Sequence, residues 1–159
     1  MSKLGIYLGD HYAASVAAVQ LARRAAQANQ GTRYGDVLAT VAEEIEEDRQ
    51  SLRLIMERLG IRPDPAKAAV AWSAEKLGRL KLNGQLTGYS PLSRLEELEI
   101  LSLGVEGKLG MWRALERALG HGVPEAELDT LIKRARSQRR RLERQRLDAA
   151  PEALSPTST

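Results

Sequence analysis

The densest group of reactive side chains in the sequence is an acidic cluster between residues 43 and 48. This stretch reads EEIEED, so five carboxylates occupy six consecutive positions and only Ile45 separates them. Carboxylates can ligate a metal ion, transfer protons, or face water on the outside of a helix. Because residues three or four apart share one side of a helix, the helical register decides which of these uses is open to each carboxylate.

A helix carrying this cluster is predicted over residues 34–59. Its apolar positions recur at alternating steps of four and three residues, and Asp48 falls on the same stripe. The stripe comprises Tyr34, Leu38, Val41, Ile45, Asp48, Leu52, Ile55 and Leu59. The carboxylates that fall off the stripe and are expected to face water are Glu43, Glu46 and Glu47. Glu44 and Asp48 therefore remain as the two that point toward or beside the core.

Three further long helices are predicted around this one. The first spans residues 2–28, the next begins at Pro91 and ends near residue 119, and the last opens at Pro124 and ends near residue 148. A shorter helix is predicted over residues 66–82, inside a connector that is too long for a tight turn. The chain is also rich in Ala, Leu, Arg and Glu and has no Phe. This order predicts an all-α, antiparallel four-helix bundle, made of two helical hairpins joined by a long, partly helical crossover.

The bulk properties of the 159-residue chain set further limits. Its length predicts one helical-bundle domain over residues 1–148, and the small, proline-bearing sequence of residues 149–159 predicts a disordered C-terminal tail. The absence of cysteine excludes disulfides and thiolate sites. No apolar run approaches the roughly 20 residues that a membrane span needs, so we expect a cytoplasmic protein without membrane contact.

The arrangement resembles the ferritin-like superfamily. The resemblance rests on the order of helix pair, crossover and helix pair, and on acidic stretches in the second helix (AEEIEED) and the third (EELEILSLGVEG). It implies a di-iron site held by single glutamates from two helices and by Glu-x-x-His pairs from the other two. Both pairs are absent here: neither Glu44 nor Glu47 has a histidine three residues later, and the last helix offers the cationic LIKRARSQRRRLE.

Two interpretations of the inward polar residues remain open. If the first two helices form a hairpin, facing positions sum to about 62, which places His11 within about one turn of Asp48. One interpretation is a degenerate metal site for iron, manganese or zinc, with the ligands His11, Glu44, Asp48 and Glu106. The other has no cofactor: these groups form a buried polar cluster in which a His11–Asp48 bond is joined by Gln138, Arg136 and Arg139.

Three glycines recur every third residue inside the third long helix, at positions 104, 107 and 110. Glycine costs up to about 1 kcal/mol relative to alanine in a helix interior, so a compensating role is expected. They allow either close packing of another helix, from this chain or a second copy, or a small cavity beside Glu106 where a ligand enters.

The last helix carries a basic run, KRARSQRRRLERQR, from Lys133 to Arg146. Such a run fits an acidic protein partner or, as a further alternative, nucleic acid, although no aromatic residue is interleaved for base stacking. The two histidines lack the partners of a nucleophilic triad. The sequence therefore predicts a non-catalytic structural or interaction protein, expected as a homodimer. The main alternative is a metal-binding bundle with a storage, redox or stress-related role.

Overall fold

The structure is a computed structural model that describes residues 2–62, 88–119 and 122–156. Four long helices account for most of that part of the chain, which contains no strand. In chain order they are α1 (Lys3–Ala28), α2 (Gly35–Arg58), α5 (Pro91–Leu119) and α6 (Glu125–Leu154). The predicted all-α class is confirmed. The short helix predicted over residues 66–82 lies outside the described residues.

The helix starts follow local signals in the sequence. Ser2 caps α1, because its hydroxyl accepts a 3.0 Å hydrogen bond from the Gly5 N–H. In the same way the Ser90 hydroxyl accepts from the Ser93 N–H at 3.2 Å at the start of α5. At the end of α2, Gly60 has a positive φ of 70°, a conformation that favours glycine and stops the helix.

The C-terminal end of α6 differs from the prediction. The helix continues through Leu154, so the expected disordered tail is wrong for residues 149–154. Ala149 is fully buried. The Glu152 carboxylate forms ion pairs of 2.6 Å with Arg33 and 2.8 Å with Arg94, and these contacts hold the last turns of α6 against the rest of the bundle.

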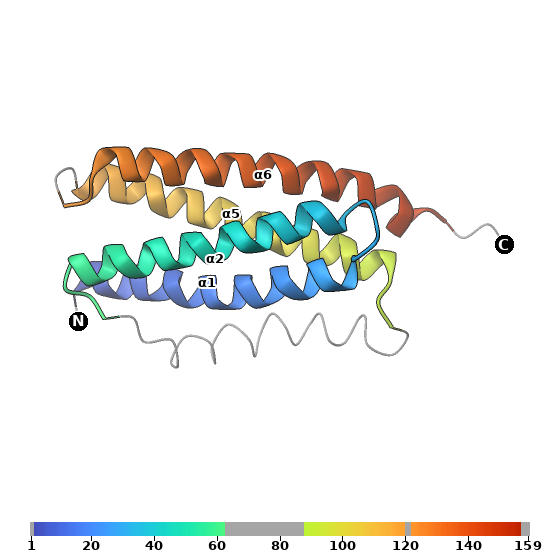
Figure 1. Cartoon of the computed structure of the whole chain (residues 1–159), viewed down its shortest axis with the longest axis horizontal. Coiled ribbons are helices and arrows are strands. Elements are labelled where there is room, and N and C mark those ends of the chain that lie inside the picture. Colours follow the sequence, from blue (N-terminus) through green and yellow to red (C-terminus); the bar gives the residue numbers. More distant parts are fainter. Residues whose placement is uncertain (1, 63–87, 120–121, 157–159) are drawn as a thin grey trace.

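Neighbouring helices run antiparallel around the bundle (Figure 1). α1 packs against α2 and α5, while α6 packs mainly against α5 and more weakly against α2. α2 ends at one end of the bundle and α5 begins at the other (Figure 1), so the two hairpins are joined across its length, as the long crossover predicted. Within the described residues, no helix is both long enough and apolar enough to cross a membrane.

The core consists of two apolar clusters separated by a polar layer. One cluster is centred on Trp112 and includes Leu52, whereas the other includes Ile45 and Val105. Between them lie the buried polar residues Asp48 and Gln138. Buried polar groups are costly unless they are hydrogen-bonded, so the residues of this layer must find partners inside the bundle.

Candidate functional site: the mid-bundle polar cluster and its cavity

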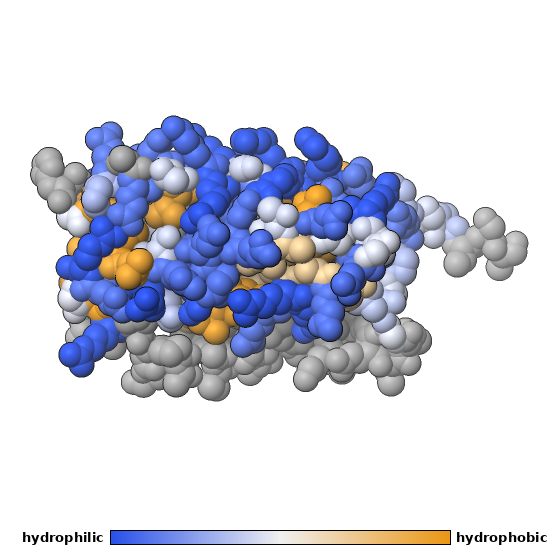
Figure 2. Space-filling model, viewed as in Figure 1, coloured by the Kyte–Doolittle hydropathy of each residue, from blue (hydrophilic) through white to orange (hydrophobic). Residues whose placement is uncertain are grey.

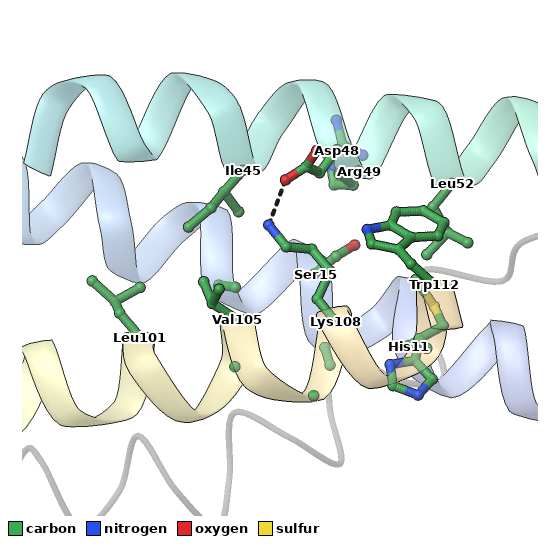
Figure 3. A pocket seen from close by; sticks show the side chains of 15 residues that line it. His11, Ser15, Ile45, Asp48, Arg49, Leu52, Leu101, Val105, Lys108 and Trp112 are labelled. Atoms are coloured by element: carbon green, nitrogen blue, oxygen red, sulfur yellow. Dashed lines mark hydrogen bonds and ion pairs between the residues drawn. The ribbon is translucent and has the colours of Figure 1, made fainter. Parts of the chain in front are cut away.

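Asp48 is the centre of the polar layer. The residue is only 2% exposed, and both of its carboxylate oxygens are occupied. Oδ1 accepts from Nε of Arg134 at 2.7 Å, while Oδ2 accepts from Nε2 of Gln138 at 3.0 Å and from Nζ of Lys108. Figure 3 shows the contact between the Asp48 carboxylate and the Lys108 ammonium. Donors from α5 and α6 thus converge on one buried carboxylate from α2.

Lys108 and Gln138 close the network on the far side of Asp48. The Lys108 ammonium donates a second hydrogen bond, 2.5 Å long, to Oε1 of Gln138. Burial lowers the pKa of Lys108, and the neighbouring Asp48 carboxylate opposes that effect. Because Gln138 accepts from one partner and donates to the other, its amide orientation is fixed by the pair. We call Asp48, Lys108, Arg134 and Gln138 the polar cluster.

Two further ion pairs extend the charge balance outward. Arg134 also contacts the exposed Glu47 carboxylate at 2.6 Å, and Glu44 pairs with Arg141 at 2.5 Å. Together with the polar cluster, three carboxylates meet three cations at this level of the bundle. The arrangement is therefore close to electrically neutral, and it has no free carboxylate oxygen on Asp48 to act as a base.

The predicted ligand residues are not brought together. Glu106 is half exposed and pairs with Arg139 at 2.8 Å, away from Asp48. Arg136 is exposed and forms no ion pair with a described residue, so it does not neutralise Glu44. In the part of the chain that the structure describes, no three histidine, aspartate or glutamate side chains are grouped so that they could hold a metal ion.

His11 does not form the predicted hydrogen bond with Asp48. Its imidazole instead lies edge-on to the ring of Tyr7, with 4.7 Å between ring centroids, and burial lowers its pKa. The predicted hairpin register is nevertheless close, because Arg49 donates to the Tyr12 hydroxyl at 2.9 Å, a pair whose numbers sum to 61. Successive residues are 100° apart around a helix, so a shift of one residue in the predicted register is enough to turn the His11 side chain away from α2.

The sequence interpretation missed two members of the polar cluster, Lys108 and Arg134. For Lys108 the periodicity offered a signal, since Leu101, Val105 and Trp112 are buried and Lys108 continues their steps of four, three and four residues. Glu106, which was chosen instead, lies two residues away and therefore about 200° around the helix. A lysine on a core stripe opposite a buried aspartate is the pattern that would have identified the pair.

A cavity of about 150 Å³ lies directly beside the polar cluster, between α1, α2 and α5 (Figure 3). Its walls are mainly apolar, and both Gly104 and Gly107 contribute to them. The sequence left two roles open for the glycines, close helix packing or a cavity, and the structure places Gly104 and Gly107 at a cavity. Trp112 lines the same space, and its indole Nε1 is the one buried side-chain nitrogen or oxygen of the described residues that has no hydrogen-bond partner.

Comparisons of this chain with protein-family models, with curated proteins and with solved structures found no match.

Proposed function

We propose that this chain is a non-catalytic interaction protein, built on a ferritin-like bundle whose mid-bundle position is occupied by the polar cluster. The up-down-down-up order of the helices supports the ferritin-like resemblance (Figure 1). The saturated hydrogen bonding of Asp48 supports a positional role for the polar cluster rather than a reaction, because a catalytic base needs a lone pair within reach of its substrate.

One surface feature carries the proposal of an interaction partner. Arg136, Arg140 and Arg144 follow one another at steps of four residues along α6, so they lie on successive turns. All three are exposed, and none forms an ion pair with a described residue. By contrast, the α6 cations that do meet a carboxylate are Lys133, Arg134, Arg139, Arg141 and Arg146. We call the three unpaired residues the arginine stripe.

Apolar side chains lie next to the arginine stripe. A surface groove between α5 and α6 is lined by Arg140 and Arg144 together with Leu103 and Leu147. These two leucines are 73% and 55% exposed, while the face seen in Figure 2 is predominantly hydrophilic. Positive charge without internal counter-charge, combined with exposed leucines, matches a partner segment that presents both carboxylates and apolar residues.

The same groove favours an acidic protein over nucleic acid. Glu99, Glu106 and Glu143 also line the groove, but each is paired with an arginine, so they do not separate the two kinds of partner. The lining of the groove has no aromatic residue on which a base could stack. An acidic amphipathic helix would instead place its carboxylates on the arginine stripe and its apolar face on the two leucines.

The test compares two double charge reversals on the same bundle. Arg140→Glu/Arg144→Glu alters the stripe, whereas Arg113→Glu/Arg117→Glu reverses two exposed α5 arginines that also lack an ion pair with described residues. The probe is a fluorescein-labelled peptide with Glu and Leu at helical spacing, followed by anisotropy at physiological salt. The stripe variant should bind at least about tenfold more weakly, and the control should change far less. Equal losses in both variants would show an effect of net charge alone and would overturn the proposal.

Two parallel measurements separate the other occupants of the groove. Binding of a labelled DNA duplex that is tighter than binding of the peptide would assign the groove to nucleic acid. Light scattering with size-exclusion chromatography determines whether the chain is the predicted homodimer. If the chain is a dimer and the stripe variant alone dissociates it, the occupant is a second copy of this chain and not a separate partner.

The metal-binding alternative is tested on the purified protein. We expect elemental analysis to find iron, manganese and zinc only at substoichiometric levels, because Asp48 is already paired with Lys108 and Arg134. Stoichiometric metal that is lost in the Asp48→Ala variant would replace the present proposal with the metal-binding function.

A further inference from the structure

The last turn of α6 places a carboxylate against two arginines at one end of the bundle. The α1–α2 turn, the start of α5 and the end of α6 all lie at this end (Figure 1). One oxygen of Glu152, Oε1, pairs with Arg33 at 2.6 Å, and the other, Oε2, pairs with Arg94 at 2.8 Å. Oε1 also accepts from the Tyr34 hydroxyl at 2.9 Å. Donors from two other parts of the fold thus hold both oxygens of one anion.

These donors are positioned by contacts that do not involve Glu152. Tyr34 is only 2% exposed, and both guanidinium groups stack on its ring, at 4.9 Å for Arg33 and 4.4 Å for Arg94. Arg94 also donates through Nε to Oδ1 of the fully buried Asn29, at 2.5 Å. The donor set is therefore built into the bundle and does not depend on the carboxylate that it holds. We call Arg33, Tyr34 and Arg94 the anion clamp.

The positive charge of the anion clamp exceeds the negative charge of its occupant. Two guanidinium groups share one carboxylate, and neither arginine forms an ion pair with another described residue. The hydrogen bond from Tyr34 and the charges of both arginines lower the pKa of Glu152, so the clamp favours an anion. A dianion would neutralise both arginines, whereas a single carboxylate neutralises one. A phosphate group approaches this charge at neutral pH and offers several acceptor oxygens.

The occupant itself is held by few contacts. Ala149 is the last buried residue of α6, and Leu154 is 65% exposed. Pro151 has no N–H, so it cannot donate to the preceding turn of the helix. From residue 150 to residue 156, the hydrogen bonds and ion pairs to described residues outside α6 all come from Glu152. A ligand of the clamp therefore has to displace one side chain and no part of the core.

We propose that the anion clamp is a binding site for a phosphate dianion, which Glu152 occupies in the unliganded protein and which phosphate takes over by displacing that carboxylate. Two phosphate oxygens take the positions of Oε1 and Oε2. The ligand approaches directly from solvent, because the side chains of Arg33 and Glu152 are 58% and 40% exposed. The site is independent of the arginine stripe, since its donors come from the α1–α2 turn and from α5.

The test compares two variants of α6 that each lose one carboxylate. Glu152→Gln frees the anion clamp, whereas Glu127→Gln removes a carboxylate that pairs with the single arginine Arg58 at 2.6 Å. The probe is inorganic phosphate at about pH 7.5 and constant ionic strength, followed at the Arg94 Nε–H signal by ¹H–¹⁵N NMR and assigned with Arg94→Lys. A tethered carboxylate competes at high effective concentration, so Glu152→Gln should bind phosphate at least about tenfold more tightly than the wild type. Glu127→Gln should stay within about twofold of the wild type.

Two further anions identify the ligand in the Glu152→Gln variant. Phosphate should bind at least about fivefold more tightly than acetate, because it carries more charge to two fixed arginines. Equal affinities would make the clamp a carboxylate site and overturn the phosphate assignment. Glycerol 3-phosphate distinguishes the sources of the phosphate group. Tighter binding than inorganic phosphate supports a phosphomonoester as the ligand, while equal or weaker binding supports free phosphate.

A second substitution locates the ion in the clamp. Arg33→Gln, added to Glu152→Gln, removes one cation from a side chain that is 58% exposed, so the variant is expected to fold. Phosphate binding should weaken at least about tenfold relative to Glu152→Gln alone. Unchanged binding would place the ion on another basic surface, such as the arginine stripe, and would overturn the proposal. Equal phosphate affinity of the wild type and Glu152→Gln would also refute it, since Glu152 would then not occupy the site.

Discussion

Removing Asp48 should destabilise the bundle more than removing any one of its partners. In Asp48→Ala, the Lys108 ammonium loses its counter-ion and keeps only Oε1 of Gln138 as an acceptor, and the Gln138 N–H loses its acceptor, although Arg134 keeps its contact with Glu47. Leaving one charge of a buried pair uncompensated commonly costs about 3–5 kcal/mol, and we expect the free energy of unfolding to fall by that amount.

Lys108→Met is the informative comparison. Asp48 would still accept hydrogen bonds from Nε of Arg134 at 2.7 Å and from Gln138 at 3.0 Å, and it would keep the 2.6 Å ion pair with Nη2 of Arg134. The methionine side chain replaces most of the aliphatic stem of the lysine. The loss should therefore be about 1–2 kcal/mol, the range of a hydrogen bond to a charged group with its partner still satisfied.

Urea unfolding followed by far-UV circular dichroism measures these differences, provided that the slope with denaturant stays constant. The double variant Asp48→Ala/Lys108→Met should be more stable than Asp48→Ala alone, because it removes the stranded ammonium. Glu47→Ala, whose carboxylate is 64% exposed, is the control and should change stability by at most about 0.5 kcal/mol. A loss for Lys108→Met as large as that for Asp48→Ala, or strictly additive effects in the double variant, would refute the coupled polar cluster.

Three further predictions concern other parts of the bundle. Burial lowers the pKa of His11 below 6.5, so its contribution to stability is present above that pH and is lost as the pH falls through the folded-state value. Urea unfolding at about pH 7.5 and about pH 5.5 should then show a smaller loss for His11→Gln than for the wild type. Deleting residues 149–159 should lower the melting temperature by several degrees, because it removes buried Ala149 and the ion pairs of Glu152, whereas deleting residues 157–159 should not. Gly110→Ala should stabilise the helix by about 0.5–1 kcal/mol in urea unfolding, since the added Cβ meets no described atom within 4 Å.

The helices and their pairing follow from local signals in the sequence. Ser2, Pro91 and Gly60 act through backbone geometry and capping, which depend on few neighbours. The antiparallel register follows from counting residues away from a short turn, and so the observed Tyr12–Arg49 contact falls within one residue of the predicted sum. Such features need no knowledge of tertiary packing.

The side of α5 that faces the core could not be predicted from the sequence as directly. Glycines at positions 104, 107 and 110 interrupt its apolar pattern, so the phase of the stripe through this region is weakly determined. A phase error of two residues exchanges Glu106, which is half exposed, for Lys108, which is largely buried. The candidate site therefore depended on a segment of α5 in which the flanking residues Leu101, Val105 and Trp112, and not the glycines, carry the periodicity.

The end of α6 shows a different limit. Residues 149–159 have the composition of a disordered tail, and Pro151 normally argues against a helix interior. However, the helix is held there by contacts that are distant in sequence, since Glu152 meets Arg33 from the α1–α2 turn and Arg94 from α5. The composition of a segment carries no information about an ion-pair partner more than a hundred residues away in the sequence.

The polar cluster and the metal-binding alternative make opposite demands on Asp48. A divalent cation at this level would need carboxylate oxygens that are free of other cations, but both oxygens of Asp48 already face Lys108, Arg134 or the Gln138 amide. Binding would have to displace the Lys108 ammonium toward the cavity and leave it near a second positive charge. Because like charges at close range in a poorly hydrated core repel strongly, we expect a divalent cation to compete with the Lys108 ammonium for Asp48. The stability of Lys108→Met in the presence and absence of Mn²⁺ addresses this competition directly: removing the ammonium is the single change that should make any latent metal affinity of Asp48 detectable.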